Sequence, residues 1–334
     1  MLRREHLSMT DPESVPALIG GPAGTRLDWE LVPLAVRSSI EAHLGMRVAR
    51  ARTQPLGLSP ALAARLQLAD GSRAFVKAIG PDSESGAPGG RDFYRREARI
   101  AAALPRSATI ARLIDSWEDH GWVALLFEDV DGESPHLPWR ELELRSVLEA
   151  ITALSVALTP SPIEVRRAGD AFHGRAHWAE LTAEPQLLEP FAALDPWVVA
   201  NLERFAGIEQ GFSEATRGDS LLHLDIRADN ILLCSDRVVF VDWPHAAVGA
   251  PWIDLVYFLP SVAMQGGPDI DELFSSHPLA DGADRDRVVT VLTVLAGFFL
   301  RGATEPPPPG LPTLRSFQWA QAVEALRWLR HMDG

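Results

Sequence analysis

The chain has 334 residues, a formal net charge of −14, 46% hydrophobic residues and 23% charged residues. This apolar share is sufficient for a sizeable core, whereas the acidic balance argues against a nucleic-acid partner, which needs a basic face. A negative field is compatible with a cationic ligand and equally with a role in solubility alone.

Membrane insertion and disulfide bonding are both disfavoured. The one cysteine, Cys234, has no partner within the chain and indicates a reducing compartment. Residues 1–16 lack the apolar core of a signal peptide. The most apolar stretch, Val288 to Leu300, is shorter than the ~20 residues of a membrane-spanning helix and predicts a buried helix. We therefore expect a cytoplasmic protein with no membrane partner.

The first part of the chain predicts a small sheet with two helices. Apolar residues recur at helical spacing from 29 to 44. Strands are predicted at 47–55, 61–68 and 74–78, and an Asp-Gly turn joins the last two as in a hairpin. A loop rich in Gly and Pro follows at 80–90, then a helix at 93–104 and an apolar strand at 122–127.

The second part of the chain is predicted to be mainly helical. Its expected helices lie near 139–158, 176–193, 196–216, 285–302 and 312–331. Short strands at 231–234 and 238–241 interrupt them, and the proline-rich segment 306–310 predicts a rigid spacer. We therefore predict an N-lobe over residues 1–130, with an N-terminal extension, and a C-lobe over residues 131–334.

The strongest signal for chemistry is the pattern His-x-Asp-x4-Asn in the segment 221–233. It places Asp225 five positions before Asn230, and Asp242 ends a second strand twelve residues later. Phosphoryl transfer requires positioning and charge neutralisation rather than covalent help. Asp225 suits the acceptor hydroxyl, Asn230 and Asp242 suit Mg²⁺, and Arg227 is a candidate to offset phosphate charge beside Asp225. The bare pattern also arises by chance, but the two strands favour the functional interpretation.

Two further candidates lie upstream of this motif. Lys77 interrupts an apolar strand, where a lysine is costly unless a partner or a phosphate receives it. Glu97 lies on the following predicted helix and is a candidate partner for Lys77. An edge-strand lysine that reaches solvent and a solvated glutamate are the alternatives. Their order relative to Asp225 favours the pair.

Taken together, these residues resemble the aminoglycoside phosphotransferase family. The matching positions are Lys77, Glu97, 223–230, 241–244 and 249–255. The resemblance implies an α+β, bilobal protein-kinase-like fold, with a small antiparallel-sheet N-lobe that binds nucleotide and a mainly helical C-lobe with the catalytic loop and acceptor pocket. It further implies these roles: base, Asp225; Mg²⁺ ligands, Asn230 and Asp242; phosphate contact, Lys77; brace of the catalytic loop, Asp254; backbone contacts to the nucleotide base, Glu128 and Val130.

The chain departs from the family pattern at two places. The turn at 54–60 retains only Gly57 where relatives often have two adjacent glycines, so Gly57 and Ser59 are candidate phosphate contacts on a less typical loop. Ser59 is equally compatible with a plain turn. Leu224 stands where glycine is usual, and it is compatible with packing inward.

The resulting functional prediction is a small-molecule kinase that uses ATP or GTP with Mg²⁺. Asp254 follows Asp242 by only twelve positions, which leaves no room for a long activation segment and disfavours a protein kinase. An aminoglycoside-like antibiotic, a sugar and an amino alcohol all remain open as acceptors. Acidic residues between 170 and 195 are compatible with a cationic acceptor or with a solvated helix face. A catalytically idle nucleotide-binding module is the alternative of another class.

Overall fold

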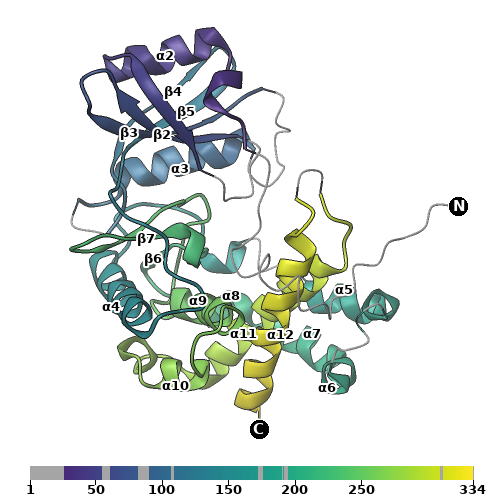
Figure 1. Ribbon diagram of the computed structural model, residues 1–334. Coiled ribbons are helices and arrows are strands. Elements are labelled where there is room, and N and C mark those ends of the chain that lie inside the picture. The colour runs from purple at the N-terminus through teal and green to yellow at the C-terminus, as the bar shows by residue number, and fades with distance from the viewer. Residues whose placement is uncertain are drawn as a thin grey trace, which may run out of the picture.

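A computed structural model describes most of the chain (Figure 1). The described residues are 26–54, 61–81, 90–106, 109–171, 176–189, 191, 195–308 and 311–333. They form a five-stranded antiparallel sheet with two flanking helices, followed by a larger helical part (Figure 1). This arrangement confirms the α+β, bilobal protein-kinase-like fold that the sequence predicts.

The strands are β1 (Val48–Thr53), β2 (Leu62–Leu68), β3 (Arg73–Ile79), β4 (Leu113–Asp119), β5 (Trp122–Glu128), β6 (Ser220–Leu222), β7 (Ile231–Leu233), β8 (Val238–Phe240) and β9 (Ala247–Gly249). The α-helices are α2 (Leu34–Leu44), α3 (Arg91–Ala103), α4 (Glu141–Ala157), α5 (His177–Ala183), α6 (Pro196–Ala200), α7 (Leu202–Glu209), α8 (Phe212–Ala215), α9 (Ile253–Met264), α10 (Ile270–Ser275), α11 (Arg285–Ala303) and α12 (Leu314–Asp333).

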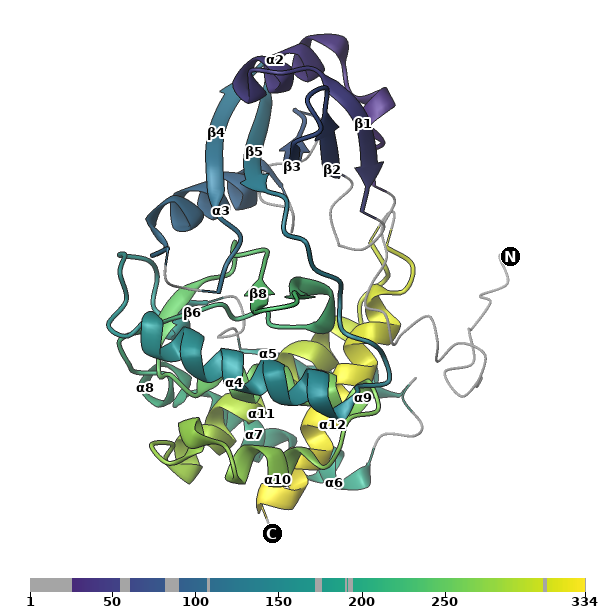
Figure 2. The same cartoon turned by 60° about the vertical axis from the view of Figure 1, so that its left-hand side comes forward.

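The five-stranded sheet, in the order β1-β2-β3-β5-β4, lies between α2 and α3 (Figure 2). Alternate residues of a strand point to opposite faces. Val76 and Ala78 of β3 therefore pack on the α2 side with Val36 and Ile40. The intervening position, residue 77, shares the other face with α3. The strand alternation thus directs one polar side chain of β3 toward that helix.

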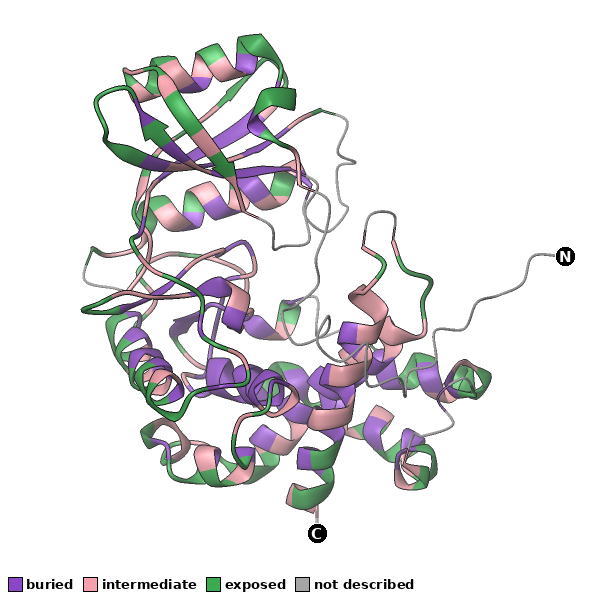
Figure 3. Cartoon of the chain, in the orientation of Figure 1, coloured by how far each residue is buried: buried purple, intermediate pink, exposed green. Residues whose placement is uncertain are grey.

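The helical part is built around α9, which is buried along almost its whole length (Figure 3). Helices α11 and α12 pack against it and against one another. Close approach of α11 to α5 depends on Gly297, because a Cβ there would lie 2.5 Å from Nε1 of Trp178. The same indole nitrogen donates to the carbonyl of Thr293 at 2.7 Å, which fixes the two helices in register.

Two short ladders, β6 with β9 and β7 with β8, lie on the side of the helical part that faces the sheet (Figures 1 and 2). The segment before β4 is bonded to the β7–β8 ladder, because Phe240 N–H donates to the carbonyl of Thr109 at 2.9 Å. The segment after β5 is bonded to the same ladder through Glu133 and Leu233, which exchange both backbone hydrogen bonds. The loops that leave β6 and β8 are thereby held close to the sheet.

Several predicted boundaries need correction. The predicted helix 176–193 ends at Ala183, because Pro185 cannot continue it and a 3-10 helix follows. The predicted helix 196–216 is three short helices, α6, α7 and α8, with breaks at Asn201 and Gly211. Elements β4, β6, β9, α9 and α10 were not predicted. In α9 ten consecutive residues are buried, so it has no polar face and no helical periodicity.

Candidate active site

Lys77 connects the sheet to both α3 and the loop after β8. Its ammonium Nζ lies 2.5 Å from Oε2 of Glu97 and 2.7 Å from Oδ1 of Asp242. The lysine side chain is 12% exposed and that of Glu97 3% exposed. A buried ammonium is stable only with such partners. The predicted pair Lys77–Glu97 is therefore present, and Asp242 from the helical part completes it.

The pKa values within this triad indicate how the charge is shared. Burial disfavours the ammonium, but the carboxylates of Asp242 and Glu97 outweigh burial and raise the pKa of Lys77. Burial opposes ionisation of Asp242 too, yet Lys77 keeps the pKa of that carboxyl well below its usual range. For Glu97 burial prevails and raises the pKa to about 7. Lys77 thus has two carboxylate partners, and the one from the helical part, Asp242, is ionised at neutral pH.

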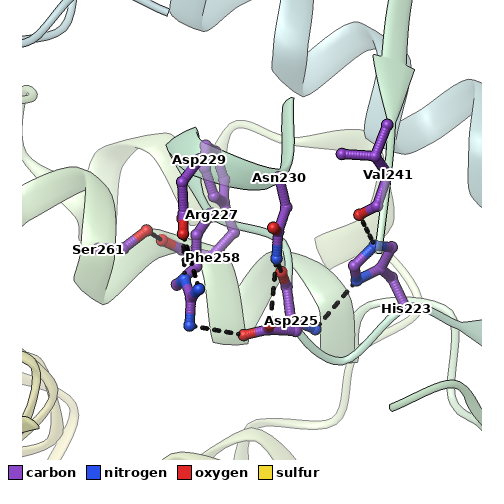
Figure 4. Close-up of polar contacts among 8 residues, drawn as sticks. All are labelled: His223, Asp225, Arg227, Asp229, Asn230, Val241, Phe258 and Ser261. Carbon is purple, nitrogen blue, oxygen red and sulfur yellow. Dashed lines mark hydrogen bonds and ion pairs between the residues drawn. The ribbon is translucent and has the colours of Figure 1, made fainter. Parts of the chain in front are cut away.

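Asp225 lies in the loop that connects β6 to β7, and two side chains hold both of its carboxylate oxygens (Figure 4). Oδ1 accepts a hydrogen bond from Nη1 of Arg227 at 3.1 Å, and Oδ2 accepts one from Nδ2 of Asn230 at 3.0 Å. Burial raises the pKa of Asp225 to about 7, although Arg227 acts in the opposite direction. A carboxylate with this pKa is suited to accept a proton near neutral pH.

Arg227 is itself oriented by a neighbouring carboxylate. Its Nε and Nη2 donate to the two oxygens of Asp229 at 3.0 and 2.9 Å, and the Asp229 side chain is only 6% exposed. The ring of Phe317, on α12, lies 5.5 Å from the guanidinium carbon. The bidentate geometry leaves Nη1 directed at Asp225, as Figure 4 shows.

Asn230 and Asp242 lie at neighbouring points of the same loop system. The Asn230 amide nitrogen donates to the backbone and the carboxylate of Asp225. Its side-chain oxygen accepts no hydrogen bond from a described residue, so it is the oxygen left for a ligand (Figure 4). Val241 N–H donates to the Asn230 carbonyl at 3.0 Å, which brings Asp242 alongside. Asp242 has φ 72°, a left-handed conformation that is uncommon outside glycine and recurs at functional sites.

His223 is a buried neutral histidine that supports this loop. Its Nδ1 accepts the Asp225 N–H at 3.2 Å and its Nε2 donates to the Val241 carbonyl at 3.0 Å, which assigns the tautomer. Burial lowers the pKa of His223 to about 4. Asp254 accepts the backbone N–H groups of His223 and Leu224, both at 2.8 Å. The contact expected of Asp254 with the loop is therefore present.

The predicted nucleotide-base segment follows β5. Glu128 N–H donates to the carbonyl of Arg112, and its carboxylate accepts the Arg112 N–H. Asp129 forms ion pairs with Arg65 and Arg73 that fix the segment. Val130 is buried, and its N–H donates no hydrogen bond to a described residue. This N–H is therefore available to a ligand. The other two candidates of the N-lobe, Gly57 and Ser59, lie outside the described residues.

No set of three or more His, Cys, Asp or Glu side chains among the described residues could hold a metal ion. A cation at Asn230 and Asp242 would need further oxygen ligands from elsewhere, which is how Mg²⁺ is commonly held. In the same described part of the chain, no helix is both long and apolar enough to span a bilayer.

The model of the phosphotransferase enzyme family, abbreviated APH, matches residues 59–288, more than half of the chain. The chain belongs to the phosphotransferase enzyme family. It is therefore a small-molecule kinase by family, as the sequence motifs predict. No curated protein sequence matches the chain.

Solved structures with the same fold include several kinases and phosphotransferases. Aminoglycoside phosphotransferase APH(4)-Ia, in a ternary complex with ADP and hygromycin B, is 14% identical with a TM-score of 0.54, covering 89% of this chain and 97% of that one. A putative fructosamine-3-kinase from Thermobifida fusca is 23% identical with a TM-score of 0.53, covering 88% and 99%. Amicoumacin kinase hAmiN, in complex with AMP-PNP, Ca²⁺ and Ami, is 11% identical with a TM-score of 0.52, covering 87% and 89%.

Sequence reasoning about this phosphotransferase left two features of the site unassigned. Asp229 lies within the motif, and the spacing Arg-x-Asp was the available signal for its pairing with Arg227. The acidic residues between 170 and 195 were considered as a group, but two of them have basic partners. Glu180 pairs with Arg301, and Asp195 pairs with Arg330.

Proposed function

We propose that this phosphotransferase moves the γ-phosphoryl group of ATP or GTP to a hydroxyl group of a small molecule. The observation that carries the proposal is the triad of Lys77, Glu97 and Asp242, which joins the sheet to the loop after β8. The ammonium group of Lys77 can exchange its contact with Asp242 for a contact with a phosphate, while its ion pair with Glu97 stays in place. This is the arrangement that phosphoryl transfer by a kinase needs.

The donor site would lie between the sheet and the β7–β8 ladder. In this proposal the backbone of Glu128 and Val130 would contact the edge of the nucleotide base, and Lys77 would contact the phosphates. The side-chain oxygens of Asn230 and Asp242 suit Mg²⁺, a hard cation that prefers oxygen ligands. Bound Mg²⁺ supplies neutralisation of phosphate charge. In this scheme residues 1–130 provide the nucleotide lobe and residues 131–334 the acceptor lobe.

Asp225 is proposed as the residue that serves the acceptor. Its carboxylate orients the acceptor hydroxyl and takes its proton as the new oxygen–phosphorus bond forms and the bond to the leaving nucleotide breaks. The raised pKa of about 7 suits this transfer near neutral pH. For the acceptor to approach, it must replace part of the contact with Arg227, whose pair with Asp229 keeps the guanidinium in place. Arg227 then lies beside the transferred phosphoryl group.

The acceptor class is open within small hydroxyl compounds, with an aminoglycoside-like antibiotic as one member. Sugars and amino alcohols are the alternatives. The proposal of a cationic acceptor rests on the net charge of −14. The 170–195 region adds less support, because Glu180 and Asp195 form ion pairs with arginines. If the acceptor is cationic, its KM rises with salt as screening increases. We also propose a cytoplasmic location, because the donor is a nucleoside triphosphate.

Nucleotide binding and turnover test the proposal in sequence. Mg–ATP or Mg–GTP at millimolar concentration should raise the melting temperature, because a ligand that binds the folded state stabilises it. Nucleoside diphosphate release is then measured against antibiotics, sugars and amino alcohols. Binding without turnover for any acceptor would favour the idle nucleotide-binding module. Absence of stabilisation by both nucleotides would contradict the proposal.

A further inference from the structure

Two arginines from different parts of the chain converge beside the loop that follows Asp242. Arg96 lies on α3, one residue before Glu97. Arg166 lies in the segment before the 3-10 helix Ala168–Asp170, and its carbonyl accepts the N–H of Val248 in β9 at 2.9 Å. The position of Arg166 is therefore set by backbone pairing.

Aromatic contacts place the two guanidinium groups around one small cluster. Nη2 of Arg166 donates to the carbonyl of His245 at 3.1 Å. The His245 ring meets Phe93 of α3 edge-on, with centroids 5.3 Å apart. The guanidinium carbon of Arg96 lies 5.8 Å from the same Phe93 ring. Arg96 and Arg166 thus flank the Phe93–His245 contact between α3 and the loop.

Neither guanidinium is neutralised by the described part of the chain. No described carboxylate lies within ion-pair distance of Arg96 or Arg166. Nε of Arg166 is buried and donates no hydrogen bond to a described residue. Burial lowers the pKa of Arg166, and repulsion from Arg96 lowers it further. By contrast Arg227, also buried, has two carboxylates. A buried donor left unsatisfied costs about 1–3 kcal/mol, and a bound ion is one way in which proteins satisfy such a donor.

We propose that Arg96 and Arg166 form a binding site for a small oxyanion, a phosphate or a carboxylate, that bridges α3 to the loop after Asp242. Guanidinium groups recognise such oxyanions through paired N–H donors, and Nε of Arg166 is the free donor of this site. An anion there offsets both charges at once. The inference does not depend on the kinase activity, because none of its residues is assigned to the nucleotide or the acceptor.

Occupancy has a structural consequence for the neighbouring triad. Arg96 adjoins Glu97 on α3, and His245 lies three residues after Asp242. An anion held by Arg96 and Arg166 therefore ties the two elements that also meet at Lys77. The folded state that has these elements in contact is the one the anion stabilises.

The melting temperature of the full chain in the presence of anions tests this site. Inorganic phosphate and acetate are titrated separately against sodium chloride at equal ionic strength, so that general screening cancels. We expect at least one of them to give a saturable rise of about 2 °C or more. The more effective anion identifies whether phosphate or carboxylate is the better ligand. No rise beyond the chloride control with either anion overturns the proposal.

Three variants assign the rise to its residues. Arg166→Gln and Arg96→Gln should each abolish most of it. Arg167→Gln should retain it, because Arg167 is exposed and donates instead to the carbonyl of Gly218 at 3.0 Å. Arg96 is only half-buried on α3, so its variant decides the matter if Arg166→Gln fails to fold. A rise that persists in both Arg96→Gln and Arg166→Gln places the anion elsewhere and contradicts the proposal.

Discussion

Asp254 accepts the backbone N–H of Leu224 at 2.8 Å while Leu224 has φ 61°. The second oxygen of the same carboxylate accepts the N–H of His223. A left-handed backbone costs an L-residue roughly 1–2 kcal/mol, so the turn exists because Asp254 satisfies two consecutive N–H groups. The left-handed φ also explains why glycine is usual at this position. Here the leucine side chain is buried, at 3% exposure.

When Leu224 is truncated, we therefore expect the glycine variant to be more stable than the alanine variant, the reverse of the usual order. Both Leu224→Ala and Leu224→Gly lose the buried side chain, but only glycine adopts φ 61° without steric cost. We expect Leu224→Gly to be more stable than Leu224→Ala by about 1 kcal/mol. Free energies of unfolding from urea titrations provide the comparison. Alanine as the more stable variant, the usual order where φ is negative, would mean that the turn is not strained.

The sequence predicts the site better than it predicts the elements around it. Lys77 and Glu97 occupy a strand and a helix with regular periodicity, so their faces follow from spacing and their contact follows from packing of α3 on the sheet. Within the 223–230 motif, the side-chain hydrogen bonds of Arg227 and Asn230 join residues at most five positions apart, so they follow from local sequence. The bonds from His223 and Leu224 to Asp254 span about 30 positions and could not be predicted from local spacing. The contacts of Arg166 with His245 span 79 residues and leave no local pattern.

The missed elements have physical causes as well. The α9 helix is buried on every side, so no polar stripe marks it in the sequence. Strand β4 has few apolar residues among polar ones, and one of them, Ile114, is 48% exposed. Its sequence therefore looks like that of a loop. Strands β6 and β9 have three residues each and exist through long-range pairing alone.

Stability should fall as the pH is lowered from 6.5 toward 4, partly because of His223. In the folded protein its pKa is about 4, below the ordinary 6.5, so its contribution is complete above pH 6.5. Below pH 6.5, His223 binds a proton in the unfolded chain but stays neutral in the folded chain, so protonation favours the unfolded state. This single group should account for about 2 kcal/mol of lost stability between pH 7 and pH 5.

His223→Gln removes that proton uptake and leaves the remaining histidines unchanged. The variant should be less stable at pH 7 but should lose less stability on acidification than the wild type. Urea titrations of both proteins at pH 7, 6 and 5 measure the difference. Parallel pH dependences would show that His223 is protonated in the folded protein.

Removal of the proposed metal ligands should reduce turnover unequally. Asp242→Ala loses the charged ligand and one of the two carboxylate partners of Lys77, so we expect turnover to be abolished. Asn230→Ala loses a neutral ligand and one support of Asp225, so some turnover should remain at high Mg²⁺. Turnover rates of both variants, measured over a range of Mg²⁺ concentrations, distinguish these two outcomes. Near-normal activity of Asp242→Ala would make Asp242 a structural residue at the end of its strand.

The central claim is that Asp225 serves the acceptor hydroxyl, and Asp225→Asn tests it most directly. The substitution keeps the shape of the side chain but removes its basicity, so kcat should fall by about 100-fold or more. Nucleotide affinity should hardly change, because Lys77, Asn230 and Asp242 remain. Asp236→Asn, the same change at an exposed position between β7 and β8, is the matched control and should behave as wild type. If instead kcat survived in Asp225→Asn while nucleotide affinity collapsed, Asp225 would bind the metal–nucleotide complex and the proposed division of roles would be wrong.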